Sequence, residues 1–186
     1  ILPTPTIGAV GLIEDIDTII AATAGNGDLA VVLGATGGHL GRSAILREVF
    51  GRDEGEAPPV DLAAERAAGA FLHDNREWVN GATDLSDGGL ALAAFEMAAA
   101  SGLGVALDAA PMATLFGEDQ GRYLLACPFD WAEELMIRAG KARVALQCVG
   151  RFGGDLVRIG GSSAPLADLV ARCAGEPRTE MTLGAI

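Results

Sequence analysis

The chain has 186 residues, enough for one substantial hydrophobic core, and this length favours one domain over two. Half of the residues are hydrophobic but only 5% are aromatic, so the core must consist mainly of Ala, Val, Leu and Ile. The formal net charge of -12 argues against a nucleic acid or an anionic membrane as partner, because such partners bind basic surfaces.

Apolar runs and helical stripes alternate along the chain, separated by turns rich in glycine or proline. Short apolar runs predict strands, and apolar residues spaced three or four apart predict helices. In chain order, the pattern predicts a strand at 7–13, a strand at 28–33, a helix at 45–50, a helix at 61–78, a strand at 79–84, a helix at 89–101, strands at 104–107 and 123–127, a helix at 128–138, strands at 145–150 and 155–159, and a closing helix at 166–173.

Three local signals refine this pattern. Asp61 is expected to cap the helix at 61–78, and Gly102 is expected to end the helix at 89–101 in a left-handed conformation. The turn at 151–154 predicts a hairpin between the last two strands. The sequence therefore predicts an α/β (α+β) fold, a layered domain with a mixed β-sheet flanked by helices.

Targeting signals are not visible in the sequence. Apolar stretches are interrupted by charges before they reach the roughly 18 residues of a membrane span, and no basic start precedes an apolar run. Cys127, Cys148 and Cys173 are odd in number, widely spaced and set among apolar neighbours, which predicts buried thiols of a cytoplasmic protein and argues against a metal site. The apolar, proline-containing start at Ile1 leads us to expect a piece of a larger polypeptide.

The stretch 83–92, with the sequence TDLSDGGLAL, carries the strongest chemical signal. Asp84 and Asp87 offer the hard oxygen ligands that Mg²⁺ prefers. The pair Gly88-Gly89 leaves the backbone open to a close approach by phosphate. The same residues also suit an ordinary capped turn, in which Ser86 or Asp87 accepts hydrogen bonds from the first N–H groups of the helix.

A second glycine-rich turn, at 34–43, joins a predicted strand to a helix. Gly37 and Gly38 are candidates for a phosphate cradle, to which Arg42 could add positive charge. The turn has neither the Gly-Lys-Ser/Thr ending of a Walker loop nor the dinucleotide-binding fingerprint. A plain tight turn is therefore the alternative interpretation.

Features of common catalytic sites are missing from the sequence. It contains no Ser-His-Asp set, no HExxH and no CxxC, which removes the usual hydrolase and zinc interpretations. His39 has no nearby nucleophile to activate, and His73 lies among polar neighbours, so both are interpreted as structural or solvent-facing. The acidic segment 117–122 by itself resembles a surface loop.

Taken in order, four segments resemble the C-terminal part of the phosphoribosylformylglycinamidine synthase family, in the wider AIR synthase-related superfamily. They are PTPTIGAVGLIED at 3–15, LGATGGHLGRS at 33–43, TDLSDGGLA at 83–91 and GEDQGR at 117–122. The resemblance implies that residues 1–186 form a single C-terminal-type domain, as in AIR synthase, of a larger chain. That family uses ATP and Mg²⁺ to convert formylglycinamide ribonucleotide to formylglycinamidine ribonucleotide in purine biosynthesis.

The family's partners and catalytic groups lie outside such a domain. Ammonia comes from a glutaminase component, and the catalytic residues belong to sibling domains, so we expect no catalytic residue in this chain. The piece could also form a homo-oligomer. Two alternatives are a free-standing module that binds a nucleotide or phosphorylated metabolite, and a piece of another enzyme of the superfamily.

Residue by residue, the resemblance implies an auxiliary nucleotide site or a vestigial one. In the first-half counterpart of the family, an aspartate aligning with Asp84 ligates Mg²⁺, and a run aligning with 118–120 touches substrate. Thr83 stands where the family usually has His, and Arg42 interrupts its glycine-serine run. The expected phosphate-binding residues are Gly37, Gly38, Ser86, Gly88, Gly89, Glu118 and Gln120, and the expected metal ligands are Asp84 and Asp87.

Overall fold

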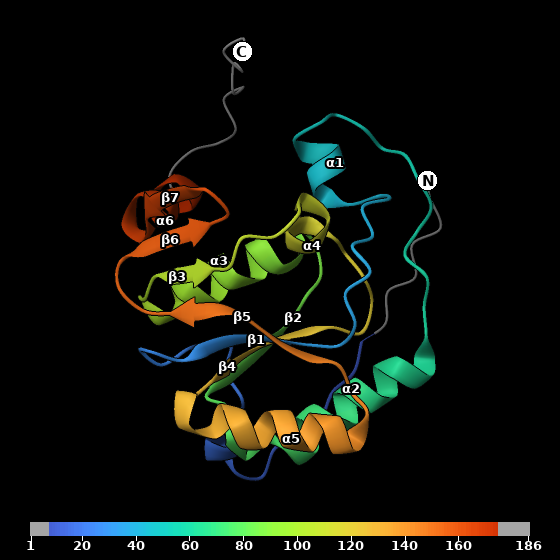
Figure 1. The fold of residues 1–186 in the computed structure, drawn as a ribbon, viewed down its shortest axis with the longest axis vertical. Coiled ribbons are helices and arrows are strands. Elements are labelled where there is room, and N and C mark those ends of the chain that lie inside the picture. The colour runs from blue at the N-terminus through green and yellow to red at the C-terminus, as the bar shows by residue number, and fades with distance from the viewer. Residues whose placement is uncertain (1–7, 175–186) are drawn as a thin grey trace.

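The computed structural model describes residues 8–174, and its central feature is a seven-stranded sheet (Figure 1). The strand order is β2-β4-β1-β5-β3-β6-β7. The strands are β1 (Leu29–Leu33), β2 (Gly81–Asp84), β3 (Val105–Leu107), β4 (Tyr123–Cys127), β5 (Leu146–Phe152), β6 (Leu156–Ile159) and β7 (Ser162–Pro165).

Helices cover both faces of this sheet, with α3 and α4 on one side and α2 and α5 on the other (Figure 1). This arrangement confirms the predicted layered fold with a mixed sheet. The α-helices are α1 (Ala44–Glu48), α2 (Leu62–Asp74), α3 (Gly89–Ser101), α4 (Met112–Phe116), α5 (Ala132–Ala142) and α6 (Leu166–Ala174), and the 3₁₀ turns are η1 (Ile16–Thr18), η2 (Arg76–Trp78) and η3 (Phe129–Trp131).

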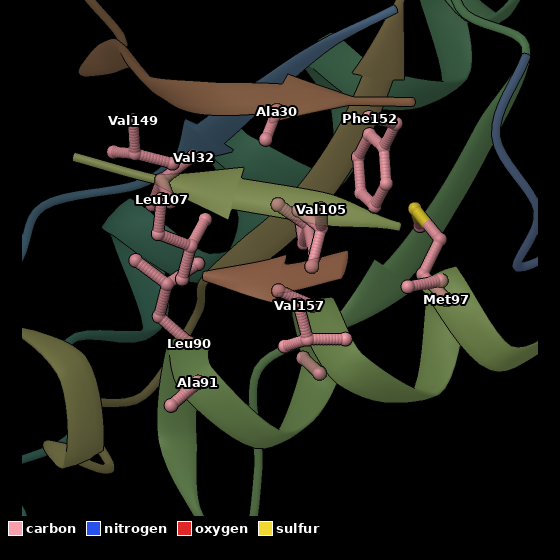
Figure 2. Close-up of a cluster of buried hydrophobic side chains, with 14 of the residues drawn as sticks. Ala30, Val32, Leu90, Ala91, Met97, Val105, Leu107, Val149, Phe152 and Val157 are labelled. Atoms are coloured by element: carbon pink, nitrogen blue, oxygen red, sulfur yellow. The ribbon is translucent and has the colours of Figure 1, made fainter. Parts of the chain in front are cut away.

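Two hydrophobic cores lie on the two faces of the sheet. Alternate residues of β1 pack into the two cores: Ala30 and Val32 face one core, and Val31 and Leu33 face the other. Because both faces are covered, β1 is a continuous apolar run and not an alternating one. Figure 2 shows the first core, where sheet residues such as Phe152 point toward α3.

The sheet is mixed for a different reason from the predicted one. β5 and β6 do not form a hairpin, because β3 lies between them and pairs antiparallel with β5 and parallel with β6. The turn at 151–154 bonds to the start of β3: Gly153 donates to Gly104 O, and Gly104 donates to Gly154 O. β6 instead pairs antiparallel with β7, a strand that the sequence analysis missed because its residues are Ser162-Ser163-Ala164-Pro165.

The predicted first strand and first helix differ most from the structure. Residues 8–13 are irregular and exposed, with Val10 and Leu12 almost fully accessible, and residue 7 lies outside the described part. Apolar composition therefore did not produce a strand there, since no strand of the described sheet pairs with this segment. The helix predicted at 45–50 ends at Glu48, buries no residue, and leaves Phe50 exposed.

The end signals of the longer helices are confirmed. The carboxylate of Asp61 accepts hydrogen bonds from Ala63 N and Ala64 N at the start of α2. Gly102 ends α3 at a left-handed φ of 64°. Within residues 8–174, no helix combines the length and apolar character needed to cross a membrane.

Burial separates the three thiols chemically. Cys127 lies at the end of β4, and burial, with smaller contributions from Asp28 and Cys148, raises the pKa of its thiol to about 11. Cys148 and Cys173 are exposed, so the expectation that all three thiols are buried is wrong for these two. The thiolate is the reactive form, so we expect iodoacetamide at pH 8 to modify Cys148 and Cys173 in the folded protein and Cys127 only after unfolding.

Mass spectrometry of the alkylated protein measures this difference. A Cys127→Ser variant should gain the same two adducts as the native chain. Three adducts forming at equal rates in the folded native protein would contradict the placement of Cys127.

Candidate functional site

A cleft of about 320 Å³ lies where the end of β2 meets the segment before β4. The stretch 83–92 and the segment 117–122 both contribute to it. Of the predicted site residues, the cleft is lined by Asp84, Ser86, Asp87, Glu118 and Gln120, whereas Gly37, Gly38, Gly88 and Gly89 are not among its lining residues.

Strand pairing brings these two segments together. β2 runs antiparallel to β4 with Asp84 opposite Tyr123, and Leu85 N donates to Arg122 O at 3.0 Å. Leu85 is buried in the core, while Asp84, Ser86 and Asp87 are exposed. The apolar anchor thus fixes the backbone and leaves the polar side chains free to meet a ligand in the cleft.

The first turn of α3 needs glycine at two positions. Gly88 is the N-cap with φ 77°, and Gly89 follows with φ 60°. A Cβ at Gly89 would lie 2.5 Å from the carbonyl oxygen of Gly117. Since the N-cap is Gly88, the expectation that Ser86 or Asp87 caps this helix is wrong.

The acceptor at this helix end comes instead from Glu118. Its Oε1 accepts hydrogen bonds from Gly88 N at 2.8 Å and from Ala44 N, the first residue of α1, at 2.7 Å. A carboxylate satisfies free N–H groups at a helix start and is favoured by the helix dipole. Glu118 therefore joins the two glycine-containing turns that the sequence analysis treated as separate phosphate sites.

Asp119 fills the glycine-rich turn at 34–43. Its Oδ2 accepts from Gly37 N at 3.1 Å and Gly38 N at 2.9 Å, and its Oδ1 accepts from His39 N at 3.1 Å. Successive backbone N–H groups of this kind form a concave anion site. Here the anion is a side chain of the same protein.

Arg122 supports the same turn from the buried side. Its Nη2 donates to Gly117 O at 2.6 Å and lies 3.6 Å from Asp119 Oδ2, and its Nη1 donates to Thr36 Oγ1 at 3.3 Å. Burial lowers the pKa of this guanidinium, while the charge of Asp119 opposes the shift. An arginine remains charged in proteins, so Arg122 is a structural cation that balances Asp119.

The sequence analysis missed the roles of Asp119 and Arg122. Asp119 and Arg122 are three residues apart, a spacing that could have indicated an ion pair. The turn at 37–39 that they stabilise is about 80 residues away in the sequence, so its contact with them gave no local signal. The N–H groups of Gly37 and Gly38 are paired with Asp119. Phosphate binding at Gly37 and Gly38 stays a prediction. A phosphate that binds there would have to displace the carboxylate of Asp119.

Few side chains of the cleft could act as ligands of a metal ion. Across the part of the chain that the structure describes, no group of three or more His, Cys, Asp or Glu side chains could hold a metal ion. Asp84 and Asp87 nevertheless present exposed carboxylates at the cleft. Mg²⁺ is commonly held by one or two carboxylates together with phosphate oxygens and waters, so these residues fit a metal that arrives with a phosphorylated ligand.

Glu118 offers a direct test of this geometry. Glu118→Ala leaves the N–H groups of Ala44 and Gly88 without their acceptor, and we expect the free energy of unfolding to fall by about 2–4 kcal/mol. Glu118→Gln keeps an acceptor oxygen and should cost less. Denaturant titration measures both variants.

The matched control is Gln120→Ala, at an exposed position of the same cleft. Its free energy of unfolding should change by no more than about 0.5 kcal/mol. Equal stability of Glu118→Ala and Gln120→Ala would show that the bridge between the two turns contributes nothing.

Comparisons with known proteins agree with this architecture. The family model for the AIR synthase related protein, C-terminal domain, matches residues 25–159. Phosphoribosylformylglycinamidine synthase subunit PurL of Roseobacter denitrificans is 63% identical over 169 residues, which are 91% of this chain and 24% of that protein. The chain thus spans about a quarter of the length of the curated relatives that it matches.

Solved structures share the fold. Thermotoga maritima PurL complexed with FGAR superposes with a TM-score of 0.70 at 24% identity, over 92% of this chain and 32% of that one. The same enzyme complexed with ATP superposes with a TM-score of 0.62 at 21% identity, over 92% of this chain and 30% of that one. With the family model covering most of its length, the chain belongs to the AIR synthase related protein, C-terminal domain, family.

Proposed function

We propose that the chain acts as a C-terminal-type domain, spanning residues 1–186, of a phosphoribosylformylglycinamidine synthase. Such an enzyme is an ATP-dependent carbon–nitrogen ligase, which converts formylglycinamide ribonucleotide and ammonia to formylglycinamidine ribonucleotide. The high identity to relatives of that name supports this proposal over a free-standing binding module. We place the enzyme in the cytoplasm, with ammonia supplied by a glutaminase component.

Within that enzyme, the chain's own site would hold a nucleotide together with Mg²⁺ and perform no chemistry. The observation that carries this proposal is the cleft itself, which is lined by exposed Asp84 at the end of β2 and by exposed Ser86 and Asp87 in the loop before α3. When bound, Mg²⁺ neutralises phosphate charge. Four carboxylates and two guanidiniums line the cleft, so an uncompensated polyphosphate would be repelled.

The histidines support a binding role without catalysis. His39 Nε2 lies 2.9 Å from Glu56 O, and the exposed His73 pairs with Asp74 on α2. Neither lines the cleft. A general base must lie within hydrogen-bond reach of the proton that it removes, and these two side chains are bonded elsewhere.

Exposed apolar residues indicate where sibling domains would pack. Val10, Leu12 and Ile13 precede the first strand, and Val49 and Phe50 follow α1, all with much of their surface accessible. Exposed apolar surface of this kind favours association. We propose that the remainder of the enzyme covers it, and that the isolated chain forms a homo-oligomer when that cover is absent.

Calorimetric titration with Mg·ADP tests the binding role. We expect saturable binding that is lost in EDTA, because the metal links the carboxylates to the phosphates. Asp84→Asn should weaken the affinity by about tenfold or more, since a charged metal ligand is replaced by a neutral one.

Asp130→Asn is the matched control, an exposed aspartate in η3 that does not line the cleft. It should bind like the native chain. Binding that persists undiminished in EDTA or in Asp84→Asn would contradict a magnesium-dependent site at this position.

A further inference from the structure

We propose that Arg42 is the residue of this cleft that contacts the outermost phosphate of the bound nucleotide, and that it leaves its ion pair with Asp53 to do so. This inference rests on the proposed nucleotide site and adds its recognition element.

Five backbone donors of the two glycine-rich turns are already paired with carboxylates. Glu118 accepts from Ala44 N and Gly88 N, and Asp119 accepts from three consecutive N–H groups at 37–39. These carboxylates are part of the fold, so a phosphate could use the same N–H groups only by expelling a charged side chain. These five donors are therefore a poor source of phosphate recognition.

Of the two guanidiniums that line the cleft, that of Arg122 is already bonded within the protein. Its side chain is 1% exposed and donates to Gly117 O, Asp119 O and Thr36 Oγ1. Moving it would leave Asp119 without its neighbouring cation. Arg42 is the remaining cation among the lining residues, and its side chain is 54% exposed.

Arg42 is held by contacts that are easily exchanged. Its Nη1 donates to Asp53 Oδ1 at 2.9 Å and its Nε donates to Gly55 O at 3.0 Å. The Asp53 side chain is 69% exposed, and ion pairs between exposed side chains contribute little to stability. A phosphate can offer the guanidinium two acceptor oxygens at once, which is the stronger pairing.

The backbone of Arg42 is held in an unusual conformation beside the same loop. Its φ is 61°, in the left-handed region that favours glycine, and its N–H donates to Glu54 O at 2.9 Å. A non-glycine residue keeps such a conformation at a cost that the surrounding contacts must offset. The loop that supplies these contacts continues to Pro58, which lines the cleft. Asp53 thus acts as an internal anion that occupies Arg42 until a ligand arrives.

The test compares Mg·ATP and Mg·ADP binding by the native chain, Arg42→Gly and Asp53→Asn. Glycine suits φ 61°, so Arg42→Gly removes the guanidinium without adding backbone strain, and circular dichroism verifies its fold. We expect Arg42→Gly to bind Mg·ATP about ten- to a hundredfold more weakly than the native chain, the usual range for a lost charged hydrogen-bonding partner. Asp53→Asn should bind equally well or up to about fivefold more tightly, because the competing anion is gone.

Arg76→Ala is the matched control, an exposed arginine of η2 that donates to His73 O and does not line the cleft. It should retain native affinity. Native binding by Arg42→Gly, or equal losses in Arg42→Gly and Arg76→Ala, would overturn the role of Arg42 while leaving the nucleotide site intact. A native chain that binds neither nucleotide would overturn both this inference and the proposed function.

Discussion

The carboxylates of Glu118 and Asp119 hold the cleft together, because they accept hydrogen bonds from backbone N–H groups of two separate turns. Glu118 accepts hydrogen bonds from the N–H groups at the starts of α1 and α3, and Asp119 accepts them from residues 37–39. The bonded pairs are 30 to 82 residues apart in sequence. Backbone groups left unpaired in such tight turns are costly. Pairing of β4 with β1 and β2 brings the three turns close together, and these two side chains fix the turns beyond the strand ends.

This constraint has a functional consequence. Glycine-rich turns at helix starts commonly bind phosphate through free N–H groups. In this protein the groups are occupied by carboxylates, and Arg122 supplies the balancing positive charge beneath them. The cleft is left with exposed Asp84 and Asp87 and with Arg42 at its rim. That set of groups is better suited to bind a phosphate through a coordinated Mg²⁺ ion and the Arg42 guanidinium than through backbone N–H groups.

The sequence predicted the bounds of some buried elements closely and those of others less well: the helix predicted at 128–138 is α5 (Ala132–Ala142), and α4 was not predicted. β1, β4 and α3 lie at the two cores, and their apolar runs matched the observed bounds within about one residue. β7 was missed because its serines and proline carry no apolar signal, and the hairpin after β5 was wrong because the position of β3 depends on long-range pairing.

At the site, the sequence indicated which segments meet but not how. Asp84, Asp87 and Glu118 do line one cleft, as the shared motifs of a known family implied. The pairing of Asp119 with residues 37–39 could not be predicted, since no local pattern reports a hydrogen bond between segments about 80 residues apart. Whether the cleft holds a nucleotide stays a prediction.

Amide hydrogen exchange followed by NMR tests the central claim most directly. We predict that the N–H groups of Gly38, Ala44 and Gly88 exchange slowly in the native chain, and that Asp119→Ala speeds exchange at Gly38 while Glu118→Ala speeds it at Ala44 and Gly88. Exchange at all three N–H groups as fast as in an unstructured loop of the native protein would contradict it.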